Sequence, residues 1–151
     1  MGLTLNGTPD VNSIRSSNYT VKIAVGYSDE DMHYSGKSMA ELGEAMEAGD
    51  YKTPARPHLE EGIENDLGGI KEAVKEYRAQ KRLHVKGFIK DASGIGMAMV
   101  EAVKEYVYSG ALAPNAPYTI AKKGSDQPLV DTGDLMNSLT YKVTRMSDNN
   151  G

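Results

Sequence analysis

The segment that decides the fold is PNAPYTIAKKGSDQPLVDTGDLMNSLTYKVTR, which runs from Pro114 to Arg145. Its last part, Leu139 to Thr144, alternates apolar and polar residues. A period of two is typical of a strand with one buried face, so we expect a strand here near the end of the chain. The residues expected to face inward are Leu139, Tyr141 and Val143.

The polar residues before this strand predict the start of a helix. Asp131 or Thr132 is a natural N-cap for a helix from Thr132 or Gly133 to Ser138, because a short oxygen-bearing side chain can accept hydrogen bonds from free backbone N–H groups. Asp134 then lies in the first turn of this helix, where a negative charge is favourable.

The N-terminal region predicts an arm, a second strand and a loop. Residues 1–17 are polar and rich in Gly, Asn and Ser, so we expect a flexible arm. Residues 19–25 alternate apolar and polar side chains and predict a strand. Residues 26–37 carry three consecutive acidic residues, which predict a solvated loop because cation-binding loops alternate their ligands with spacers.

Two helices are expected in the first half of the chain. Ser38 and Glu41 have the spacing of a capping box, and Gly49 is a natural stop for the helix they open. Apolar residues recur at helical spacing over residues 59–82 and predict a longer helix. We expect a break or bend at Gly68-Gly69 because each glycine costs about 1 kcal/mol relative to Ala.

A third helix is expected to open at Asp91 or Ser93 and to end at Gly110, with a short helical turn at residues 118–122 after it. The segment 83–90 between the helices suits either a short strand or a helix end. The third helix has a wide apolar face, which predicts burial against the sheet and against another helix or another subunit.

These elements predict an α+β fold with a small antiparallel sheet packed against two or three helices. We expect one domain over residues 18–145 and a disordered tail over residues 146–151. Between the first two helices, Pro54 and Pro57 predict an extended segment, because each proline restricts itself and the residue before it. Arg56 is therefore held on a stiff segment, either for a fixed ion pair or facing solvent.

The composition excludes several kinds of site. The 151-residue chain has no Cys, so it has no disulfide, thiolate metal site or Cys nucleophile. Its histidines, His33, His58 and His84, lack metal-ligand spacing, and we expect no metal and no other cofactor. The sequence also lacks an apolar run of membrane length and a signal-peptide pattern, so we expect a soluble protein made in the cytoplasm with no membrane partner.

Two functional alternatives arise from local patterns. A basic stripe on the helix of residues 59–82 would suit nucleic acid, but Glu72 and Glu76 interleave with it and the net charge is −4, so an ordinary solvated face is favoured. The stripe consists of Lys71, Lys75, Arg78 and Arg82, together with Lys86 provided that the helix extends that far.

The second alternative is a retroviral-type aspartic peptidase, because Asp131-Thr132-Gly133 follows two apolar residues as in the catalytic loop of that class. A single such loop would need a homodimer to complete its carboxylate pair. The peptidase fold continues with several further strands, whereas here a turn of helix and one strand are expected. We therefore do not expect an enzyme.

The C-terminal segment resembles the phage virion-morphogenesis or tail-completion family, whose members lie at the head–tail junction, or neck, of tailed bacteriophages. Two upstream pieces agree in order, with His58 at a position where an aromatic residue is usual. The matching pieces are Ala45–Gly49, Pro54–Leu59, Leu112–Pro114, Thr119–Asp126, Pro128–Leu135 and Ser138–Tyr141.

The resemblance implies a structural virion protein that forms a homo-oligomeric ring, a hexamer, at the head–tail junction. Its partners would be head connector or adaptor proteins on one side and the tail tube or tail terminator on the other. DNA would pass through the ring without sequence-specific binding. A tail terminator ring is the alternative within the same class.

Within such a ring, we expect charged and polar contacts to set the register between subunits. The residues assigned to these contacts are Arg56, Lys122, Lys123, Ser125 and Asp126. The residues assigned to turns and caps are Pro54, Pro57, Asp131, Thr132 and Gly133.

Overall fold

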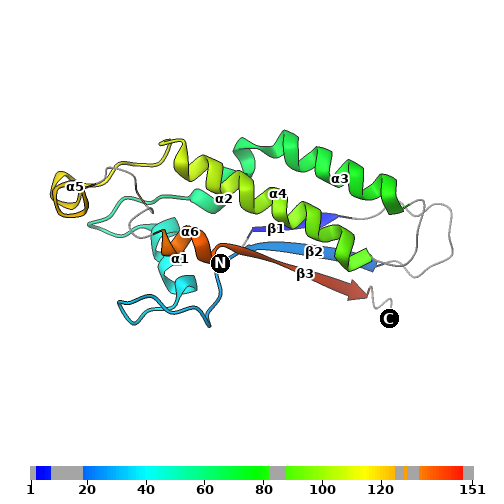
Figure 1. Ribbon diagram of the computed structural model, residues 1–151, viewed down its shortest axis with the longest axis horizontal. Helices are drawn as coiled ribbons and strands as arrows, with labels where there is room; N and C mark the ends of the chain where they lie inside the picture. Colours follow the sequence, from blue (N-terminus) through cyan, green and yellow to red (C-terminus); the bar gives the residue numbers. More distant parts are fainter. Residues whose placement is uncertain (1–2, 8–18, 82–87, 125–127, 129–132, 148–151) are drawn as a thin grey trace.

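A computed structural model describes residues 3–7, 19–81, 88–124, 128 and 133–147. In this part of the chain, six helices accompany a three-stranded antiparallel sheet, which confirms the α+β class (Figure 1). Helices α2 (His58–Asn65), α3 (Leu67–Lys81) and α4 (Phe88–Tyr108) lie on one side of the sheet. Helices α1 (Met39–Ala48), α5 (Pro117–Lys123) and α6 (Asp134–Ser138) gather toward one end of the molecule.

The sheet has the order β1-β2-β3, with β2 (Tyr19–Gly26) in the centre, as predicted for residues 19–25. Ile23 and Val25 of β2 are buried and lie opposite Val143 and Tyr141 of β3 (Thr140–Ser147). The intervening residues of β3 are exposed, so the predicted alternation is confirmed. These outward residues are Thr140, Lys142 and Thr144.

Strand β1, at the start of the chain, corrects the prediction of a flexible arm over residues 1–17. Residues Leu3–Gly7 form β1, which pairs antiparallel with β2 along its whole length. Leu3 and Leu5 do alternate with polar residues. However, five residues within a Gly- and Asn-rich stretch are too few to predict a strand from alternation alone. At the other end, Met146 and Ser147 belong to β3 rather than to a tail. Residues 8–18 and 148–151 lie outside the described part.

Helix α1 (Met39–Ala48) begins and ends as predicted. The Ser38 side chain accepts a hydrogen bond from the backbone N–H of Glu41 at 3.1 Å, and the Glu41 carboxylate accepts from the Ser38 N–H at 2.9 Å. Gly49 follows the helix with a φ of +66°, a conformation that favours glycine.

The expected long helix is divided into α2 (His58–Asn65) and α3 (Leu67–Lys81). The break lies at Asp66, just before the predicted glycine pair. The Asp66 carboxylate accepts a hydrogen bond from the Gly69 N–H at 3.3 Å, and a Cβ on Gly69 would lie 2.5 Å from this carboxylate. Because the helix restarts here, Leu67 leaves the buried stripe and is exposed.

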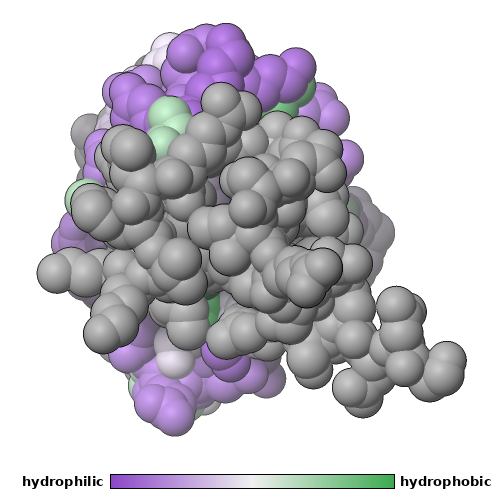
Figure 2. All heavy atoms as spheres, turned by 90° about the vertical axis from the view of Figure 1, so that its right-hand side faces the viewer, coloured by the Kyte–Doolittle hydropathy of each residue, from purple (hydrophilic) through white to green (hydrophobic). Residues whose placement is uncertain are grey.

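The basic stripe lies partly on α3. Lys71 and Lys75 are exposed, and Lys75 pairs with Glu72 one turn away, as expected for a solvated face. The described surface at the end of the molecule where α3 finishes is mainly hydrophilic (Figure 2). The Arg78 side chain and residues 82–87 lie outside the described part.

Helix α4 (Phe88–Tyr108) forms the centre of the core. It begins at Phe88, before the predicted caps at Asp91 or Ser93, so that prediction is wrong and residues 88–90 of the ambiguous segment are helical. Its wide face contacts α2 and α3 as well as β2 and β3, so helices of the same chain cover it. The turn after it contains Gly110 with a φ of +80°. Its buried residues include Ile95, Met99, Val100, Ala102, Val103 and Val107.

The C-terminal segment forms α5 (Pro117–Lys123) and α6 (Asp134–Ser138), and α6 leads directly into β3. Gly133 occupies the N-cap position of α6 with a φ of +81° and caps it without a side chain. The predicted cap at Asp131 or Thr132 is therefore wrong, because the turn uses a left-handed glycine; those two residues lie outside the described part. Asp134 lies in the first turn as predicted.

The close contact between α4 and β3 predicts opposite effects for two neighbouring glycines. A Cβ on Gly96 would lie 2.3 Å from Cδ2 of Tyr141, whereas a Cβ on Gly94 would meet nothing within 4 Å. We expect Gly96→Ala to lower the free energy of unfolding by about 1–3 kcal/mol through overpacking. Gly94→Ala should raise it by up to about 1 kcal/mol through helix propensity. Urea denaturation of both variants tests this, and equal effects would contradict it.

Candidate functional site

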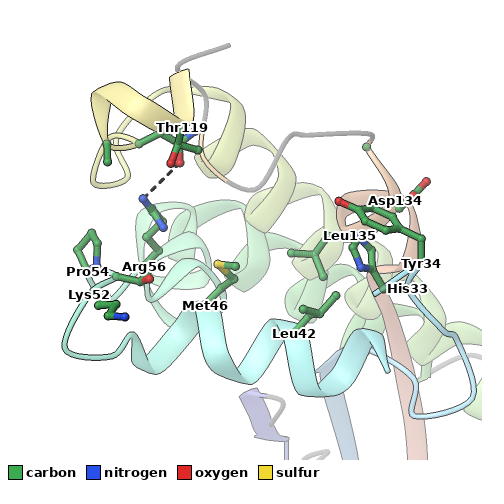
Figure 3. A pocket seen from close by; sticks show the side chains of 14 residues that line it. His33, Tyr34, Leu42, Met46, Lys52, Pro54, Arg56, Thr119, Asp134 and Leu135 are labelled. Carbon is green, nitrogen blue, oxygen red and sulfur yellow. Dashed lines mark hydrogen bonds between the residues drawn. The ribbon is translucent and has the colours of Figure 1, made fainter. Parts of the chain in front are cut away.

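A groove of about 360 Å³ lies between α1, the segment before α2, and the starts of α5 and α6 (Figure 3). Lys52, Pro54 and Arg56 lie toward one end of the groove, and His33, Tyr34 and Asp134 toward the other. The apolar side chains between the two ends are Leu42, Met46 and Leu135.

Arg56 joins three parts of the chain at this groove. Its Nε donates a hydrogen bond to the Ala113 carbonyl at 2.8 Å, and its Nη2 donates to the Pro114 carbonyl at 3.1 Å. A longer contact of 3.4 Å reaches the Asn115 side-chain oxygen (Figure 3). The backbone N–H of Arg56 donates to the Met46 carbonyl of α1 at 2.8 Å. One residue thus positions both walls of the groove.

The environment of Arg56 differs from both predicted alternatives. Arg56 is only 5% exposed, so it does not project into bulk solvent. In the described part, its hydrogen-bond acceptors are neutral oxygens rather than a carboxylate, so it forms no ion pair there. Burial lowers the pKa of the guanidinium, in line with a charge that lacks a full counter-charge. Because the ordinary pKa of a guanidinium lies far above neutral, Arg56 still keeps its positive charge beside the groove.

A buried hydrogen-bonded network lies next to Arg56. The ring of His58 is fully buried, and its Nδ1 is 2.9 Å from both the Arg56 carbonyl and the Glu47 carboxylate. Its Nε2 is 2.7 Å from the Tyr27 hydroxyl. Because Nδ1 faces two acceptors, we assign the ring hydrogen to Nδ1, and the Tyr27 hydroxyl then donates to Nε2.

Glu47 also supplies the cap that α2 lacks. Pro57 occupies the N-cap position of α2 and caps it without a side-chain hydrogen bond. The Glu47 carboxylate instead accepts from the N–H groups of Leu59 at 3.1 Å and Glu60 at 3.3 Å. Burial alone raises the pKa of Glu47, but the hydrogen bonds from His58 and these N–H groups outweigh burial and bring the pKa below its ordinary value.

Tyr27 completes this network against α1. A Cβ on Gly43 would lie 2.2 Å from the Tyr27 ring, so the ring packs directly on the helix backbone. Burial, and to a lesser degree the charge of Glu47, raises the pKa of Tyr27. The phenol thus stays protonated and remains a donor. These contacts let the network hold α1, α2 and the end of β2 together.

The structure brings together part of the predicted set of interface and turn residues. Pro54, Arg56 and Gly133 all line the groove, and Lys122 is exposed on α5. Pro57 occupies the N-cap position of α2, next to Arg56. The other predicted residues lie outside the described part, although for Lys123 this holds only for the side chain. They are Lys123, Ser125, Asp126, Asp131 and Thr132.

Sequence reasoning missed the Tyr27–His58–Glu47 network and a set of exposed tyrosines. Tyr34 lines the groove and is 78% exposed, while Tyr51 and Tyr118 are 90% and 78% exposed and adjoin the lining residues Lys52 and Thr119. Nothing in the local sequence distinguishes these tyrosines from buried ones. Tyrosine is enriched in protein interfaces, so the rim of the groove suits contact with another chain.

Comparisons with protein-family models, curated proteins and solved structures find no match. Over the described residues, acidic and histidine side chains form no cluster suited to a metal ion. His33 hydrogen-bonds Ser35, and His84 lies outside the described part. Within the same residues, no helix is long and apolar enough to cross a membrane.

The hydrogen bonds of Arg56 predict a large effect on stability. Arg56→Leu removes the donors to the Ala113 and Pro114 carbonyls, and we expect the free energy of unfolding to fall by about 2–4 kcal/mol. The matched control is Lys52→Leu, an exposed residue of the same groove, which should change it by less than about 0.5 kcal/mol. Denaturant titration measures both. Similar values for the two variants would show that Arg56 does not hold the groove together.

The lowered pKa of Glu47 predicts a pH-dependent contribution to stability. A carboxyl with a lower pKa in the folded than in the unfolded chain stabilises the fold above its unfolded pKa, and this contribution disappears as the pH falls through the folded pKa. The stability difference between wild type and Glu47→Gln should therefore be largest above about pH 5 and shrink below about pH 4. The exposed Glu44 provides the control Glu44→Gln, for which no such trend is expected. Urea titrations at several pH values test this.

Proposed function

We propose that this chain is a structural virion protein of a tailed bacteriophage that forms a neck or tail-completion ring joining the head connector to the tail. The observation that carries this proposal is the convergence of the family-like segments on one groove. Arg56, from the Pro54–Leu59 segment, hydrogen-bonds Ala113 and Pro114, which lie 57 and 58 residues further along the chain. Thr119 and Leu135, from two further matching segments, line the same groove.

The exposed tyrosines support a role in protein contact. Tyr34, Tyr51 and Tyr118 are the most exposed of the large hydrophobic side chains in the described part. Tyr34 lines the groove, and Tyr51 and Tyr118 adjoin the lining residues Lys52 and Thr119 in the sequence. Tyrosine offers a large apolar surface with a polar tip and loses little conformational entropy when ordered, so it stabilises contacts between chains. A groove rimmed in this way suits a permanent interface between subunits.

The sheet supports assembly through a second feature. Its order places β1 and β3 at the two edges, so each has one side without a strand partner among the described residues. Open edges favour pairing with other chains unless something covers them. In a closed ring, neighbouring subunits can cover such surfaces, and head-to-tail contacts around an axis produce a ring.

The charged part of the proposal centres on α5. Lys122 is exposed on this helix, one turn beyond the groove-lining Thr119. We propose that Lys122 and Lys123 make charged contacts that set the register of a hexameric ring. The ring would contact head connector or adaptor proteins and the tail tube or terminator, and DNA would pass through it without sequence-specific contacts.

Assembly of the purified protein tests the proposed function. We expect the wild type to give a hexamer mass by light scattering and rings in negative-stain images. Lys122→Glu combined with Lys123→Glu should leave the circular dichroism spectrum of a folded chain but abolish assembly, because the reversed charges repel their partners. The control Lys71→Glu reverses an exposed charge on α3 and should assemble normally.

A wild type that remains monomeric at all concentrations and in the presence of the connector would contradict the proposed function. Normal rings from the Lys122→Glu, Lys123→Glu variant would leave the ring standing but would remove these lysines from its interface.

A further inference from the structure

The outer face of α4 carries a row of exposed residues that its own chain does not bury. Met97, Glu101, Glu105 and Tyr108 follow one another at steps of four, four and three, which places them on one side of the helix. Both Glu residues are exposed, and Met97 and Tyr108 are 59% and 48% exposed. We call these four residues the α4 ridge. It extends for about 16 Å at 1.5 Å per residue.

The groove has the complementary chemistry. At one end it offers the exposed ammonium of Lys52, with the largely buried guanidinium of Arg56 beside it, and within the described residues no carboxylate lies within ion-pair distance of either. Between its ends lie apolar side chains, and the exposed Tyr34 lines the end away from Lys52. The apolar side chains are Leu42, Met46 and Leu135.

We propose that the groove of one copy of this chain receives the α4 ridge of the next copy, with Glu101 and Glu105 facing Lys52 and Arg56. Met97 and Tyr108 would then cover apolar side chains and tyrosines of the groove. This inference rests on the proposed function, because it names the surfaces through which the ring assembles.

A second copy is the occupant that fits best, because one molecule carries both halves of the contact. The ridge and the groove are different surfaces, so their contact is head-to-tail and leaves a free groove and a free ridge at the two ends of every pair. Repetition of the same contact closes a ring when the rotation between neighbouring copies divides a full turn evenly. The pairing also gives Arg56 a counter-charge, which no described carboxylate of its own chain provides.

Charge reversal on each surface tests the pairing. Lys52→Glu and Glu105→Lys should each weaken self-association about tenfold or more, measured by sedimentation or light scattering across a concentration series. Both substitutions in one chain should restore association to within about threefold of the wild type, because the opposite charges face each other again. Arg56 is left unchanged in these variants because it also supports the fold.

Mixing the two single variants provides a second measurement. Neither should assemble alone, but an equimolar mixture should form an alternating ring in which every contact pairs opposite charges. The control substitutions Lys71→Glu and Glu76→Lys reverse exposed charges on α3 and should leave association unchanged.

The outcomes separate this inference from the proposed function. Rings from the wild type together with normal assembly of both single variants would overturn the ridge-in-groove contact and leave the ring itself standing. Loss of assembly in both single variants without rescue in the double variant or in the mixture would also overturn the pairing. A monomeric wild type would overturn both proposals.

Discussion

The hydrogen bonds of Arg56 are the interaction on which the groove depends. The guanidinium holds the Ala113 and Pro114 carbonyls, while the backbone of the same residue contacts Met46 at the end of α1 and His58 at the start of α2. Because the guanidinium donors have a fixed planar arrangement, they hold two carbonyls at once, which an ammonium group does less well. Flanking prolines limit how far the backbone beneath this side chain can move.

The Tyr27–His58–Glu47 network extends this constraint into the interior. It shares the Arg56 carbonyl, caps α2 through Glu47 and packs the Tyr27 ring on α1. The apolar core around α4 is held instead by the close packing of neighbouring helices. A Cβ on Gly62 of α2 would lie 2.8 Å from the Val103 Cα of α4, so these helices pack almost backbone to backbone. Polar contacts therefore organise the groove, and dense packing organises the core.

This division bears on where the proposed interface lies. The core helices cover one face of the sheet, and α4 keeps only its outer face exposed, whereas the groove is built from short helices and connecting segments. Such segments can present charged and aromatic side chains because their backbone polar groups are satisfied by Arg56, Glu47 and the helix caps. The same arrangement leaves a cationic end in the groove and an acidic ridge on α4.

The sequence by itself determined the features that depend on neighbouring residues. The alternation of β2 and β3, the capping box of Ser38 and Glu41 and the glycine after α1 all follow from local spacing. The sequence also predicted a helix break close to Asp66, at Gly68-Gly69. Only the tertiary structure decided the strand β1, the left-handed cap at Gly133 and the partners of Arg56 and His58. The pairing of β1 and the partners of Arg56 and His58 depend on contacts between residues far apart in the chain, which local spacing cannot specify. The cap at Gly133 depends on backbone geometry, and the sequence offered several residue types for that position. Most of the helices and strands were therefore predictable, whereas the site was predictable only in its location near Arg56 and the C-terminal segment.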